Sequence, residues 1–165
     1  MSDAYEEIIG GQRIHRRPPS KYHEVLVARL HRLVEEFLPL NSTLRLLPPR
    51  ASLDLEGQSL LRPDLALIRV EPSTEAAPRP VKLYLVAEVL DPGDHHCDTV
   101  VKKQLWTDGR LPRLWMVDPR YLNVEIYGCV EHGFSLIDIL ANQQTLTDPY
   151  LPGLNCSMHE LFAGT

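Results

Sequence analysis

The sequence is poor in cysteine, and the few cysteines it has are scattered. Cys97, Cys129 and Cys156 form no Cys-x-x-Cys pair. An odd and dispersed set fits reduced thiols better than the disulfide framework of a small secreted protein. Long apolar runs are also missing, since no stretch approaches the ~20 residues that a membrane helix needs. The first seven residues lack the basic region and apolar core of a signal peptide, so we expect a cytoplasmic protein with no membrane association.

Positive charge is in deficit, because 17 Lys and Arg residues stand against 22 Asp and Glu residues, a net charge of −5. This balance argues against a protein that coats nucleic acid non-specifically, where a basic surplus is expected. Basic residues nevertheless gather close to the start of the chain. We predict that Arg16, Arg17 and Lys21 contact the phosphates of a nucleic acid, and the alternative is an ordinary solvated surface.

The chain length suits a single domain that covers residues 1–165 and has a complete hydrophobic core. Hydrophobic periodicity predicts a first helix over residues 21–38, which Ser20 caps. A second helix is predicted over residues 99–108, with Asp98 as its cap.

Strands are predicted around these helices. The residues before the first helix indicate a short strand or hairpin with a turn. Apolar or alternating segments predict strands at 43–47, 51–61 with a break at Gly57, 64–70, 83–90, 114–117, 122–127 and 133–138. A loop with three prolines is expected at 71–81, and a short helical turn at 158–162. The order of elements predicts an α+β (α/β-like) fold, with a mixed β-sheet flanked by helices.

One carboxylate, Glu88, lies inside an otherwise apolar strand. Such a carboxylate is costly to bury unless something pairs with it. Asp64 begins the neighbouring predicted strand after a proline, and Lys102 lies on the second helix. Carboxylate oxygens are the ligands of Mg²⁺, and a cation stabilises charge on a phosphate. We therefore predict that Asp64 and Glu88 hold Mg²⁺ (or Mn²⁺) and that Lys102 is the accompanying cation.

The same residues have simpler interpretations. Asp64 could just start a strand after proline, and Asp98 with Lys102 could form a surface pair worth about 0.3–0.5 kcal/mol. Strand alternation predicts that Glu88 shares a face with Tyr84, Val86 and Leu90.

The order Pro-Asp, then Glu in an apolar strand, then Lys resembles the PD-(D/E)XK nuclease superfamily. More narrowly, nearly the whole chain resembles the Uma-two type restriction endonucleases, a bacterial family. The segments that carry the resemblance are Tyr5–Gly11, Pro18–His23, Pro63–Asp64, Glu88–Leu90, Asp98 through Lys102 to Trp106, Trp115–Pro119, Leu151–Leu154 and Glu160–Phe162.

The resemblance implies a restriction-endonuclease-like domain that cleaves DNA with Mg²⁺ or Mn²⁺. It implies Asp64 and Glu88 as metal ligands and Lys102 as the catalytic cation, displaced from the strand to the helix. Glu24 on the first helix would be the additional acidic residue that many members of the superfamily use. The alternative is that Glu24 is an ordinary exposed glutamate of the helix. We also expect a homodimer. The sequence departs from the family at Asp91, where serine is usual.

Two other functions stay open. The acidic balance and Asp91 favour a noncatalytic nuclease fold that serves as an interaction or homo-oligomeric module. A small zinc-binding regulator built on His95, His96 and Cys97 is a third interpretation, although adjacent residues do not easily converge on one tetrahedral ion.

Overall fold

The structure is a computed structural model, and it describes residues 4–38, 43–55, 58–70, 82–93 and 95–163. The loop predicted at 71–81 lies outside these residues. The elements, in chain order, are β1 (Tyr5–Ile9), β2 (Gln12–Arg16), α1 (Lys21–Phe37), β3 (Leu44–Leu46), β4 (Leu53–Leu55), β5 (Ser59–Leu61), β6 (Leu65–Arg69), β7 (Lys82–Val89), η1 (Cys97–Lys102), α2 (Lys103–Asp108), β8 (Arg113–Asp118), β9 (Asn123–Val130), β10 (Gly133–Ala141), β11 (Thr145–Asp148), β12 (Leu151–Ser157) and α3 (Met158–Phe162).

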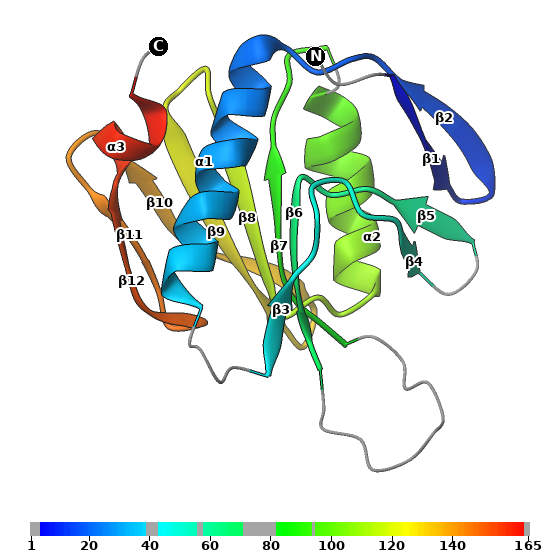
Figure 1. Cartoon of the computed structure of the whole chain (residues 1–165). Helices are drawn as coiled ribbons and strands as arrows, with labels where there is room; N and C mark the ends of the chain where they lie inside the picture. The colour runs from blue at the N-terminus through cyan, green and yellow to red at the C-terminus, as the bar shows by residue number, and fades with distance from the viewer. Residues whose placement is uncertain (1–3, 39–42, 56–57, 71–81, 94, 164–165) are drawn as a thin grey trace.

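A six-stranded sheet lies at the centre, in the order β10-β9-β8-β7-β6-β3 (Figure 1). Strands β7 and β8 run parallel, and the other neighbouring strands are antiparallel. Parallel neighbours need a crossover connection, and the helical stretch η1–α2 forms part of it. The sheet is therefore mixed, which confirms the predicted α+β class.

The two faces of this sheet carry separate hydrophobic cores. Helix α1 packs on one face together with α3 and the β11–β12 hairpin, around Trp115. Helix α2 covers the other face with Trp106, beside a four-stranded sheet of order β2-β1-β5-β4. The hairpin β1–β2 thus stands against the face that carries α2, and Figure 1 shows it beside the helical stretch η1–α2.

Helix α1 forms because its apolar residues recur at spacings of three and four, as predicted. The hydroxyl of Ser20 accepts a hydrogen bond from the amide of His23 at 3.1 Å, which starts the helix. The buried stripe consists of His23, Leu26, Val27, Leu30 and Val34. The stripe that packs the helix therefore also carries one imidazole to the sheet.

No helix in the described part of the chain combines the length and the apolar character that a bilayer crossing requires.

The register of β6 and β7 brings the two predicted carboxylates side by side. Leu65 lies opposite Ala87 in this antiparallel pair. Asp64, one residue before β6, therefore stands across from Glu88, one residue after Ala87. Opposite residues of an antiparallel pair point to the same face, and here it is the face that carries α2.

Strand β7 departs from simple alternation at its other end. The register shifts between Leu67 and Ile68, so that β7 accommodates an extra residue there. Tyr84 consequently packs against the core on the α1 side, whereas Val86 and Leu90 belong to the opposite core. The prediction that Glu88 and Tyr84 share one face of the sheet is wrong for this reason.

Candidate active site

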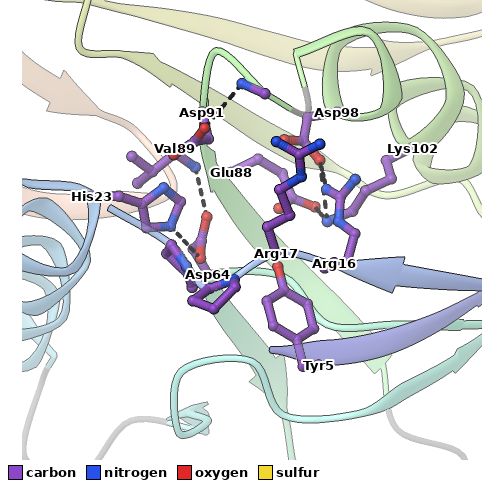
Figure 2. Close-up of a pocket in the computed structure, with 13 residues that line it drawn as sticks. Tyr5, Arg16, Arg17, His23, Asp64, Glu88, Val89, Asp91, Asp98 and Lys102 are labelled. Carbon is purple, nitrogen blue, oxygen red and sulfur yellow. Dashed lines mark hydrogen bonds and ion pairs between the residues drawn. The ribbon is translucent and has the colours of Figure 1, made fainter. Parts of the chain in front are cut away.

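The candidate site lies where the start of β6, the end of β7, the first turn of α1 and the hairpin β1–β2 meet (Figure 2). A cavity of ≈ 30 Å³ lies among these elements, and Asp64, Glu88 and Lys102 all line it. That volume suits a water molecule or two, or a small ion, since a cavity needs roughly 10–15 Å³ to hold one water.

Asp64 is held from several sides. The Nε2–H of His23 donates to its Oδ1 at 3.0 Å, and the amide of Val89 donates to its Oδ2 at 2.9 Å. Nε of Arg50 lies 3.4 Å from the same Oδ1. Burial raises the pKa of Asp64, but the hydrogen bond from His23 and the charge of Lys102 outweigh it, so the pKa lies below its usual value. Asp64 is therefore an oriented carboxylate that stays ionised at neutral pH.

Glu88 differs from Asp64 in the direction of its pKa shift. Its Oε1 accepts the indole N–H of Trp106 at 3.1 Å and lies 2.7 Å from Nζ of Lys102. Burial raises the pKa of Glu88 to about 8, because the charge of Lys102 lowers it less than desolvation and the other carboxylates raise it. The cavity therefore has one carboxylate that is ionised at neutral pH and one that keeps its proton up to about pH 8.

Lys102 is a buried cation surrounded by carboxylates. Its side chain is 1% exposed, and Nζ lies 2.7 Å from Glu88, 3.3 Å from Glu7 and 3.8 Å from Asp98. Burial lowers the pKa of Lys102, but the carboxylates raise it well above its ordinary value. Lys102 therefore stays protonated and is suited to be a fixed cation, not a general base. Lys103 points elsewhere, with Nζ 3.6 Å from the ring centroid of Tyr127.

The helix that carries Lys102 begins with a π-helical segment, η1, and this corrects the prediction for Asp98. Asp98 lies inside η1 and its side chain makes no cap; it is buried and bonds to Arg16. The Asp98–Lys102 pair is thus internal, not a surface contact. Single π-helical turns are frequent at functional sites, and this one lies directly against the cavity.

The predicted basic arm divides between the surface and the interior. Arg17 and Lys21 are exposed. Arg16 is 3% exposed, which corrects its expected place on the surface. Its Nε lies 3.2 Å from Oε2 of Glu7. Arg16 and Arg17 both line the cavity, while a contact between any of these residues and a nucleic acid stays a prediction.

Glu24 does not line the cavity. Its Oε1 accepts a hydrogen bond from Arg50 at 2.5 Å, and its side chain is partly exposed. Arg50 in turn lies against Asp64. Glu24 therefore reaches the predicted metal ligands only through Arg50.

Three residues of the site were not predicted from the sequence, namely Glu7, His23 and Arg50. Glu7 is fully buried and contacts both Lys102 and Arg16. A signal for it existed, since Tyr5, Glu7 and Ile9 alternate along β1 and share one face. Tyr5 also lines the cavity, and burial raises its pKa to about 12.

The donor set at the cavity fits magnesium. Mg²⁺ is usually held by one or two carboxylates together with water, and Asp64 and Glu88 supply two. Among the residues that the structure describes, no group of three His, Cys, Asp or Glu is placed to hold a metal. A structural zinc site needs four ligands, so the described residues give no support to zinc on His95, His96 and Cys97.

Comparison with known proteins identifies the family and supports the fold. Residues 2–159 match the profile of the Uma2 family, described as "Putative restriction endonuclease". The chain belongs to the Uma2 family. A solved structure, described as a putative nuclease belonging to DUF820 from Anabaena variabilis ATCC 29413, has a TM-score of 0.75 and covers 95% of this chain and 89% of that chain. The two chains are 14% identical, so this likeness shows the fold. The search of curated proteins gave no match.

Proposed function

We propose that this Uma2 protein is a Mg²⁺-dependent endonuclease that hydrolyses phosphodiester bonds of DNA. The observation that carries the proposal is the convergence of Asp64, Glu88 and Lys102 on one small cavity. Two hard carboxylates and a permanently charged ammonium are the groups that metal-assisted phosphodiester hydrolysis requires. Family membership supports the same reaction class.

Each residue has a separate part in the proposed reaction. Asp64 and Glu88 would hold the ion, which when bound polarises a phosphate oxygen and makes water more acidic. His23 and the amide of Val89 fix the orientation of Asp64, and Trp106 fixes that of Glu88. Lys102 stabilises negative charge that develops on the phosphate, a preorganised electrostatic effect that is strong in a buried site.

The balance of buried charge favours a divalent ion. Four buried carboxylates stand against two buried cations around the cavity, namely Glu7, Asp64, Glu88 and Asp98 against Arg16 and Lys102. A divalent ion would offset the excess of negative charge that results when Glu88 is ionised.

Metal affinity should depend on pH because the ion competes with a proton for Glu88. The pKa of Glu88 is raised to about 8, so below that pH binding must displace the proton. We expect the affinity for Mg²⁺ to increase by up to roughly tenfold per pH unit from about pH 6 to about pH 8 and then to level off. Isothermal titration at several pH values measures this, and a flat affinity over that range would contradict the role of Glu88.

The proposed activity is tested with purified protein and supercoiled plasmid DNA. Nicked or linear product should form with Mg²⁺ or Mn²⁺ and should not form when the metal is chelated. A wild-type protein that gives no metal-dependent product under any of these conditions would favour the noncatalytic interaction module instead.

A further inference from the structure

Lys102 belongs to a closed ring of four buried charges, called here the charge ring: Glu7, Arg16, Asp98 and Lys102. Glu7 bridges the two cations, with Oε1 3.3 Å from Nζ of Lys102 and Oε2 3.2 Å from Nε of Arg16. Asp98 bridges them again, since its Oδ1 accepts a hydrogen bond from Arg16 and lies 3.8 Å from Nζ of Lys102. Figure 2 shows the side chains of Arg16, Asp98 and Lys102 pointing toward one another.

Stability alone does not account for this ring. Its four members are at most 4% exposed, and taking charges out of water is expensive enough that apolar replacements of buried ion pairs are often neutral or stabilising. The ring also links three separate elements, because Glu7 comes from β1, Arg16 from β2, and the other two from η1. Arg16, Asp98 and Lys102 all face the candidate cavity.

The ring gives Lys102 partners other than the predicted metal ligand. The shortest contact of the ammonium is with Oε1 of Glu88, at 2.7 Å, and a bound ion would compete for that carboxylate. Glu7 and Asp98 remain available to hold the ammonium when Glu88 turns to a metal. Glu7 is itself anchored, since its Oε1 also accepts the amide of Arg62 at 2.7 Å.

We propose that Glu7 and Arg16 are positioning residues that hold the ammonium of Lys102 in the active site, so that the inward-facing side chains of these two hairpin residues act on the catalytic cation. This inference rests on the proposed function, since it assigns these residues a task in the same reaction. Neither residue needs to touch the substrate; both act through Lys102.

The hairpin provides a matched control. Glu6 and Arg13 form a second glutamate–arginine pair on the same two strands, at 3.2 Å, but their side chains are 47% and 73% exposed. The variants Glu7→Gln and Arg16→Gln therefore test the ring, and Glu6→Gln and Arg13→Gln make the same chemical changes on the outer face. The double variant Glu7→Gln/Arg16→Gln removes one charge of each sign and leaves the net charge of the site unchanged, which protects against loss of folding.

Two readouts distinguish positioning from general stabilisation. We expect kcat to fall by roughly 10–100-fold in each ring variant with little change in KM, because misplacement of a catalytic group has effects of that size. The double variant should be no worse than the single variants, since residues that act as one unit are not additive. The second readout does not depend on activity. The buried ammonium of Lys102 should give a ¹H–¹⁵N NMR signal in the wild type, because its protons are protected from exchange with water. The signal is assigned by its loss in Lys102→Met.

That ammonium signal should shift or vanish in Glu7→Gln and Arg16→Gln and stay unchanged in the two control variants. A folded ring variant, single or double, with wild-type kcat and an unchanged ammonium signal would overturn the inference. If the wild type cleaves no DNA, the proposed function fails, and the ammonium signal alone then decides whether Glu7 and Arg16 position Lys102.

Discussion

Replacing Lys102 by methionine should lower the rate of DNA cleavage by roughly 10²–10³-fold, the range found when one preorganised charge-stabilising group is removed. The ammonium is the cation nearest to Glu88 among the described residues, and its charge is fixed by the surrounding carboxylates. Binding of Mg²⁺ should persist, because Asp64 and Glu88 remain. The measurement is kcat at saturating metal and DNA, with metal affinity determined separately.

The neighbouring residue is the control for this prediction. Lys103→Met also removes a lysine from the same helix, but from a position over the ring of Tyr127, so cleavage should continue at the wild-type rate. Loss of Lys102 leaves the buried Glu88 without its cation and is expected to cost about 3–5 kcal/mol of stability, so folding is verified by circular dichroism. Wild-type kcat in folded Lys102→Met would contradict the role given to this residue.

Replacing Glu88 by glutamine should abolish metal-dependent cleavage and change how stability depends on pH. The pKa of Glu88 is raised from 4.5 to about 8, so between these values the folded protein keeps a proton that the unfolded chain has released. The contribution of Glu88 to wild-type stability therefore falls as pH rises through this range. Glutamine does not titrate, so the Tm of the variant relative to the wild type should be higher at about pH 8 than at about pH 5 without metal.

Thermal unfolding of both proteins at the two pH values measures this difference. Glu36→Gln is the matched control, because Glu36 is a largely exposed helix glutamate paired with Arg32, and its Tm difference from the wild type should not depend on pH. The same difference at both pH values for Glu88→Gln would show that Glu88 titrates normally and is not the proton-holding carboxylate of the site.

The core of the site could be predicted because its signals are local. A glutamate in an apolar strand requires a partner whatever the fold, and the strand that follows Pro63 supplied an adjacent carboxylate. The helical spacing that separates Lys102 from Lys103 selected the inward residue. Each of these inferences needs only the direction of a side chain on its own element.

The surrounding residues could not be placed in the same way. Arg16 and Asp98 are 82 residues apart in the chain, and their contact depends on how the hairpin β1–β2 folds over η1. Arg16 looked like part of an exposed basic cluster, and alternation along a five-residue strand did not reveal that it points inward. The cap assigned to Asp98 followed the usual preference at helix starts, which the π-helical segment overrides.

The fold, like the site, was predicted where the signal is local and missed where it depends on packing. Strongly periodic segments such as α1 were predicted to within one residue, and the short helix α3 was predicted with its full span. The hairpin β11–β12 was missed, because Pro152 and Gly153 inside β12 are unfavourable in strands. Strand β12 packs against α1, and this contact stabilises a strand that the local sequence does not indicate.

The whole proposed reaction depends on a divalent ion held in one cavity between Asp64 and Glu88. The most direct test is calorimetric titration of Mg²⁺ into the wild type, Asp64→Asn and Glu88→Gln, near pH 8, where Glu88 can ionise. We expect saturable binding of one ion per chain in the wild type and its loss in both variants, each of which removes one of the two carboxylate ligands. Absence of binding by the wild type, or equal binding by all three proteins, would contradict it.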